Sequence, residues 1–208
     1  MRRTPSAFVE RLAGVADRWR SLWVDAFTPG NASFSGHLPV LVTSDAELAH
    51  AYYLGALLAL YLRNSKVSSI GPVFLTGGPR PGATATYYGD QSEWARTAAM
   101  LEPVGLRAWI LAAHAQPYEA SHSFDTFKLL PVGNPYAAND HVLFGIVESY
   151  AAVTGDLAVL DESVRGMSVL DHLRARAYRP RTNPSRFGSR VLVDFDVRVG
   201  VCAGVRVR

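Results

Sequence analysis

Thr84-Ala-Thr-Tyr-Tyr-Gly-Asp-Gln-Ser-Glu-Trp-Ala-Arg-Thr-Ala-Ala-Met-Leu101 joins a long polar loop to a helix. Its spacing predicts a helix over 91–101, and Pro103 begins a second helix because proline suits the first helical turn. Together they are typical of an αα-hairpin. The preceding loop, 63–89, is far longer than the connections usual in compact domains, which indicates a functional or ligand-facing segment.

The same pattern extends in both directions and predicts an all-α fold. Further helices are expected over 5–25, 45–63, 137–154 and 157–177, with Gly155 as a stop and a weak point near Gly166. The first carries an apolar stripe typical of core packing, formed by Phe8, Leu12, Val15, Trp19, Leu22 and Trp23. The second, capped by Ser44, is apolar almost all round, so we expect burial on most of its sides.

A second polar loop, 116–136, separates the hairpin from the helix expected over 137–154. Because each hairpin returns the chain to the same end of a stacked-helix assembly, both long loops are expected on one rim. That rim would gather the chemically capable side chains, namely Arg80, Tyr87, Tyr88, Asp90, Trp94, His122, Asp125, Asn139, Asp140 and His141.

Asp90 and Glu93 allow two interpretations. Asp90 precedes the helix and Glu93 follows three residues later, which is the spacing of a capping box. The same two carboxylates, beside Tyr87, Tyr88 and Trp94, also suit a carbohydrate site, since flat aromatic rings can stack on a pyranose. Asn139 and Asp140 would hydrogen-bond sugar hydroxyls or hold the second loop, and Asp140 fits equally well as a cap of the helix expected over 137–154.

Composition excludes several classes of protein. The chain has 208 residues, 49% of them apolar and 19% charged, which suits one folded domain. Cys202 is the only cysteine, so an internal disulfide is excluded, and His122 and His141 lack partners at metal-ligand spacing; we expect no metal and no cofactor. The longest apolar run, 49–62, is too short to span a bilayer, and the first residues lack a secretory leader, so a cytoplasmic location is expected.

Charge is distributed unevenly. Residues 1–164 hold 11 Lys/Arg against 15 Asp/Glu, whereas 165–208 hold 10 Arg against 3 Asp. The basic segment lacks interleaved aromatics or a recognition-helix pattern, so no specific nucleic-acid binding is expected. Its last part, 195–208, alternates Val with Arg or Gly, which fits either a final strand or coding sequence read out of frame, and we separate it from a domain over 1–194.

Several segments together resemble the six-hairpin (α/α)6-barrel glycoside hydrolases, especially bacterial relatives of glycoside hydrolase family 63. The resemblance runs from about 23 to 194. Its motifs are Phe27-Thr-Pro-Gly-Asn-Ala-Ser-Phe-Ser-Gly-His37, Tyr52-Tyr53, Phe74-Leu-Thr-Gly-Gly-Pro-Arg80, Thr86-Tyr-Tyr-Gly-Asp90 through Trp94, Tyr136-Ala-Ala-Asn-Asp140, Val153-Thr-Gly-Asp156 and Leu160-Asp-Glu162.

The resemblance implies hydrolysis of an O-glycosidic bond with inversion, Asp90 being the general acid. Burial among neighbouring rings would keep that carboxyl protonated. Substrate contacts would come from Arg80, Tyr87, Tyr88, Glu93, Trp94, Asp125, Asn139 and Asp140. Gly89 stands where the family commonly has Trp.

The resemblance covers only the N-terminal part of the barrel. It implies that the catalytic base belongs to the C-terminal half, which this sequence lacks, so we expect a truncated N-terminal part without the base. Its exposed apolar helix faces could self-associate. The alternative is a non-catalytic carbohydrate-binding or assembly module.

Overall fold

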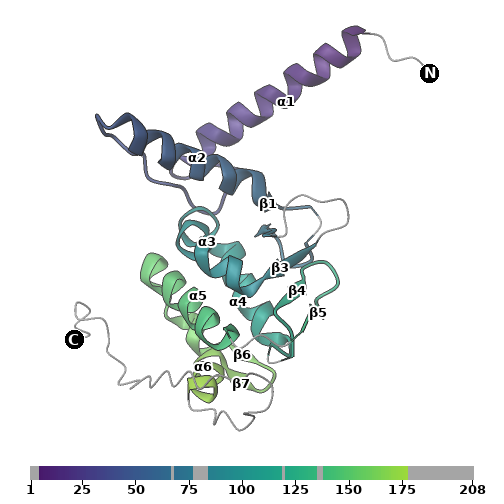
Figure 1. Ribbon diagram of the computed structural model, residues 1–208, viewed down its shortest axis with the longest axis vertical. Helices are drawn as coiled ribbons and strands as arrows, with labels where there is room; N and C mark the ends of the chain where they lie inside the picture. The colour runs from purple at the N-terminus through teal and green to yellow at the C-terminus, as the bar shows by residue number, and fades with distance from the viewer. Residues whose placement is uncertain (1–4, 67, 77–83, 119, 135–137, 178–208) are drawn as a thin grey trace.

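The computed structural model describes residues 5–66, 68–76, 84–118, 120–134 and 138–177, and for 5 and 6 the backbone only (Figure 1). Arg80 and the tail 195–208 therefore lie outside the described residues. The helices are α1 (Pro5–Ala26), α2 (Ala46–Leu62), α3 (Tyr88–Leu101), α4 (Pro103–Ala115), α5 (Asn139–Thr154) and α6 (Val169–Ala177), with a 3₁₀ turn at Ala158–Asp161. The strands are β1 (Arg63–Asn64), β2 (Val73–Phe74), β3 (Ala85–Tyr87), β4 (Ser123–Asp125), β5 (Leu130–Val132), β6 (Ser163–Val164) and β7 (Met167–Ser168).

The described chain is mostly helical, as predicted, but it is not all-α. Three small antiparallel sheets join β1 to β2, β3 to β4 to β5, and β6 to β7. The expected helix over 157–177 was wrong in its first half. Arg165 and Gly166 both have positive φ, 54° and 78°, which is the backbone of a tight hairpin turn, so this segment forms β6 and β7 before α6 begins.

Four helices form the main packing unit. Along the chain α3, α4 and α5 follow one another, yet α3 packs chiefly against α5, while α4 contacts α3, α5 and α6. Small residues on α3, Ala95, Ala98 and Ala99, are buried and let a neighbouring helix come close. The largest fully buried side chains include Trp109, Tyr88 and Phe124, whose rings contact one another at the end where α3 begins.

A buried ion pair fastens the corner between α3 and α4. Glu102, 1% exposed, accepts a hydrogen bond from Nε of Arg63 at 2.5 Å and another from the Ser35 hydroxyl at 2.9 Å. Arg63 also donates to the Ser33 carbonyl and lies 4.5 Å above the Phe34 ring. The pair thus holds the 33–35 segment against the start of β1, so two distant parts of the chain keep one geometry.

α1 and α2 are less covered than the sequence predicts. The cap of α2 is Asp45, which accepts from the amides of Glu47 and Leu48, and not Ser44. Only Ala56, Ala59 and Leu60 of α2 are buried, so the expectation of burial on most sides was wrong for the described chain. α1 projects from the rest of the molecule (Figure 1), and the first half of its apolar stripe stays exposed. Within the described residues no helix combines the length and apolarity needed to cross a membrane.

Candidate functional site

The two long loops meet in one three-stranded sheet. β3, from the end of the first loop, pairs antiparallel with β4, from the second loop, and Tyr87 lies opposite Ser123. β4 then pairs with β5 through a hairpin inside the second loop. Thr126 strengthens the connection, since its amide and hydroxyl both donate to the Thr84 carbonyl at 2.9 Å. The predicted proximity of the two loops is therefore present, although strands and not bare loops provide it.

One short segment of the second loop also bridges the first turns of α3 and α5. The amide of Tyr88 donates to the His122 carbonyl at 3.1 Å. The side-chain amide of Asn139 donates to the carbonyls of Tyr118 and Ser121 at 2.7 and 2.5 Å. The starts of both helices thus lie at the same end of the bundle, around Tyr118, Ser121 and His122.

Asp90 lies in the first turn of α3 and is exposed. The helix begins earlier than predicted, with Tyr87 as the residue before its first turn and no side-chain hydrogen bond closing that end, so the capping box is not formed. The expectation that neighbouring rings bury Asp90 was also wrong. Tyr88 faces the core and leaves the carboxyl uncovered, Glu93 is exposed, and Trp94 is half-buried against the core.

Tyr87 and Tyr88 have different surroundings despite being adjacent. Tyr87 is half-buried and stacks on His122, with ring centroids 5.3 Å apart and planes 6° from parallel. The Tyr88 ring is fully buried and meets Trp109 edge-on at 5.9 Å. Successive residues at a strand end point to opposite sides, so only Tyr87 remains on the rim. It forms a flat aromatic surface with His122.

Gly133 keeps that aromatic surface in place. Its φ is +84°, and a Cβ added there would lie 1.9 Å from Cε1 of His122. The His122 ring is also held by the backbone of Asn134, whose amide lies 3.3 Å from Nδ1. The position of His122 therefore depends on a glycine directly after β5.

Asp125 shapes the β4–β5 hairpin. Its carboxylate accepts from the amides of Phe127 and Lys128, both at 2.8 Å, which is the arrangement of an Asx turn. Partial burial raises the pKa of Asp125, but hydrogen bonds from the Lys128 amide, the Thr84 side chain and the Phe127 amide outweigh burial and lower it below its ordinary value. Its hydrogen bonds are thus with its own hairpin and with Thr84, the residue before β3.

Asn139 and Asp140 are adjacent, but only Asn139 is buried and holds the second loop, while Asp140 is exposed. Asn139 is 2% exposed and fixes the second loop through the bonds described above. Asp140 is exposed in the first turn of α5, and the residue before that turn is Ala138, with no side-chain cap, so the capping interpretation of Asp140 was wrong. Asp140 and Asp90 are therefore two exposed carboxylates in the first turns of neighbouring helices.

A buried polar cluster, His114, Tyr118, His172 and Arg176, lies behind this end. The Tyr118 hydroxyl and Nδ1 of His172 are 2.9 Å apart, and the Arg176 guanidinium sits 3.1 Å from the centre of the Tyr118 ring. Arg176 also donates to the Asn139 carbonyl at 3.5 Å, which joins the cluster to the start of α5. Sequence reasoning missed this cluster, because its members come from α4, the second loop and α6 with no shared motif.

His114 is neutral in this environment. Its pKa is lowered to about 4, mainly by burial; a bond to the Ile110 carbonyl opposes the shift, and the charge of Arg176 and the presence of His172 add to it. Nδ1 lies 2.8 Å from that carbonyl and so carries the proton. Nε2 is then an acceptor, buried and without a hydrogen-bond partner among the described residues.

The described residues include no group of three or more His, Cys, Asp or Glu side chains arranged to hold a metal ion. What the rim offers is an exposed carboxylate on each of two helix starts, a stacked Tyr–His surface, and a second loop fixed in place by Asn139. Comparison with protein-family models, with curated proteins and with solved structures gave no match for this chain.

Proposed function

We propose that this chain forms the acid-bearing rim of an inverting glycoside hydrolase built on (α/α)6 hairpins. The observation that carries the proposal is the position of Asp90. It is exposed in the first turn of α3, at the end of the bundle where the two long loops join in one sheet. The packing of α3 on α5, with α4 connecting them along the chain, supports a repeated hairpin arrangement.

In this proposal Asp90 protonates the oxygen of the leaving group. A sugar ring can rest on the flat surface of Tyr87 and His122 beside it, and Asp140 can accept hydrogen bonds from sugar hydroxyls. Inversion requires a second carboxylate roughly 6.5–9.5 Å from the acid to activate water on the opposite face. The family resemblance assigns that base to a C-terminal half of the barrel, and we assign no described residue to it.

The exposure of Asp90 sets a condition on the chemistry. A carboxyl in water is ionised at neutral pH, whereas a general acid must hold its proton until the leaving group departs. Asp90 can act as the acid only if bound sugar, or further protein, covers it and removes water. Activity should therefore depend on the sugar or the further protein that covers Asp90.

The test is hydrolysis of a panel of α-glucosides and α-mannosides, with the product anomer resolved by NMR. The wild type is compared with Asp90→Asn and with Asp161→Asn, the same change at an exposed carboxylate in the 3₁₀ turn that follows α5, away from the rim. Turnover requires a base from a second copy or from residues outside the described ones; where it occurs, we expect an inverted product and a loss of turnover in Asp90→Asn of at least 10²-fold, the lower end of what a general acid contributes. Equal turnover by wild type and Asp90→Asn would refute the assignment of Asp90.

A second candidate is a carbohydrate-binding module without catalysis, favoured by that same exposure of Asp90. It predicts sugar binding that Tyr87→Ala abolishes and Asp90→Asn leaves nearly unchanged, with no turnover by any variant. Isothermal titration with the same sugars separates the two candidates. A cytoplasmic location remains a prediction.

A further inference from the structure

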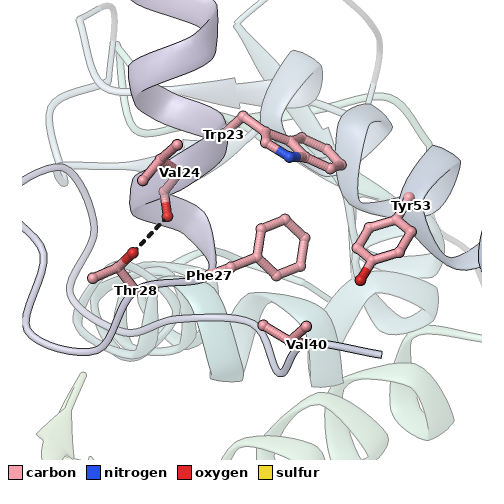
Figure 2. A pocket seen from close by; sticks show the side chains of 6 residues that line it. All are labelled: Trp23, Val24, Phe27, Thr28, Val40 and Tyr53. Carbon is pink, nitrogen blue, oxygen red and sulfur yellow. Dashed lines mark hydrogen bonds between the residues drawn. The ribbon is translucent and has the colours of Figure 1, made fainter. Parts of the chain in front are cut away.

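The apolar hollow beside α1 has a volume of about 490 Å³ and is lined by Trp23, Val24, Phe27, Thr28, Val40 and Tyr53 (Figure 2). The hydroxyls in its lining are already bonded, since Thr28 donates to the Val24 carbonyl at 2.8 Å and Tyr53 donates to the Leu41 carbonyl at 2.9 Å. Nothing in the structure shows what would occupy this hollow. The buried polar cluster behind the rim is different, because its contacts have a defined direction and lead to the candidate site.

Tyr118 connects α6 to the second loop through two different groups. Its hydroxyl lies 2.9 Å from Nδ1 of His172 on α6, and its carbonyl accepts the side-chain amide of Asn139 at the start of α5. The other ring nitrogen of His172 lies 2.8 Å from the Val164 carbonyl in β6. A carbonyl can only accept, so in the neutral ring Nε2 carries the proton, Nδ1 is an acceptor and the Tyr118 hydroxyl is the donor.

The hairpin before α6 holds the same part of the second loop at another point. Arg165, in the turn between β6 and β7, donates to the Gln116 carbonyl at 2.9 Å, two residues before Tyr118. Its φ of 54° is left-handed backbone, which a residue other than glycine keeps only where its surroundings hold it. The Arg176 guanidinium on α6 covers the Tyr118 ring. The start of the second loop is therefore fastened to β6, β7 and α6 together.

From there the contacts continue to the rim. Asn139 also donates to the Ser121 carbonyl at 2.5 Å, and the next residue, His122, accepts the Tyr88 amide at 3.1 Å. Asp90 follows two residues later in the first turn of α3. A continuous series of hydrogen-bonded groups thus runs from α6 to the turn that carries the proposed acid.

We propose that Tyr118 is a positioning residue for the rim, and that its hydrogen bond to His172 couples α6 to the first turn of α3. Tyr118 and His172 are 7% and 4% exposed, so breaking their bond leaves a buried donor and a buried acceptor without partners. The inference concerns the turn that the proposed function uses. Its test needs no turnover, so it can fail while the assignment of Asp90 stands, and the reverse also holds.

The test is amide hydrogen exchange of the full chain, followed by NMR, in wild type, Tyr118→Phe and Tyr150→Phe. Tyr150 is the matched control, a 3% exposed tyrosine near the other end of α5 whose hydroxyl donates to Asp156 at 2.7 Å. The Leu38 amide, bonded to the Ala26 carbonyl, corrects each variant for general loss of stability. After that correction we expect Tyr118→Phe to speed exchange of the Tyr88 amide about tenfold, and Tyr150→Phe to speed it less than about threefold. Equal acceleration in the two variants would overturn the proposal.

A double-mutant cycle tests whether the bond to His172 carries the coupling. Tyr118→Phe is combined with His172→Leu, which removes the acceptor. If the bond carries the coupling, the Tyr88 amide of the double variant exchanges no faster than that of His172→Leu alone. Effects that multiply would show that the two side chains act independently, and the proposed bond would be the wrong one. Should His172→Leu fail to fold, the comparison of Tyr118→Phe with Tyr150→Phe decides by itself.

Discussion

Lowering the pH should destabilise this protein through His114. The pKa of this histidine is about 4 in the folded chain against an ordinary 6.5, mainly because the ring is buried. An unfolded chain therefore binds a proton more readily than the folded one between these values. Stability attributable to neutral His114 is complete above pH 6.5 and is lost as the pH falls toward 4. The difference between the two pKa values corresponds to a loss of about 3 kcal/mol in the free energy of unfolding once both states are protonated.

The window between pH 7 and pH 5 isolates this effect. Over that range the linkage relation gives a loss of about 2 kcal/mol from His114 alone. The pKa values of Asp125, Asp156 and Asp171 are lowered below the ordinary 3.8, so these carboxylates cost stability only at more acidic pH. A loss of stability measured above pH 5 is therefore not caused by these three carboxylates.

Urea unfolding at pH 7, 6 and 5 measures the free energy of unfolding for wild type, His114→Gln and His50→Gln. His50 is exposed on α2 and serves as the matched control. We expect His114→Gln to lower stability at pH 7 and to remove most of the dependence on pH, while His50→Gln keeps the wild-type slope. If wild type and His114→Gln lose equal stability between pH 7 and pH 5, the buried neutral histidine is not the cause.

Two further substitutions test the parts that position the rim. Glu102→Gln should cost about 3 kcal/mol in urea unfolding at pH 7, because it leaves the Arg63 guanidinium without its charged partner at a site that is largely shielded from water; a cost below 1 kcal/mol would contradict this. Gly133→Ala should lower the melting temperature more than Gly155→Ala does. Both glycines have positive φ, but only at Gly133 would the new Cβ overlap a side chain, that of His122. Equal shifts would show that the ring simply moves aside.

Sequence reasoning predicted the helices well where a local signal marks each end. Pro103 begins α4, and Gly155, with φ of 72°, ends α5 as predicted. The prediction failed where pairing with a distant part of the chain determines the local secondary structure. Tyr87 becomes part of a strand because β4, more than thirty residues away in sequence, supplies the hydrogen bonds. Hairpin formation at Arg165–Gly166 likewise depends on two positive φ values that helical periodicity does not reveal.

Only part of the candidate site could be predicted from the sequence. The grouping of Tyr87, Asp90, Asn139 and Asp140 at one end follows from loop lengths and hairpin topology, and the structure has the two helix starts together. The burial of each side chain could not be predicted. Tyr88 and Asp90 lie two residues apart in α3, on nearly opposite sides of a helix with 3.6 residues per turn, so which of them faces the core depends on where the helix begins rather than on residue type.

The sheet shared by the two loops has a consequence for motion. Because β4 is hydrogen-bonded to β3 on one side and to β5 on the other, neither loop can open without breaking bonds that belong to its neighbour. The amides of Tyr88 and Thr126 should then exchange with solvent at similar rates, as one cooperative opening unit. A ligand that contacts only the first loop, beside Asp90, would slow amide exchange in the β4–β5 hairpin as well. Binding at one loop would then stabilise the other without any change of conformation.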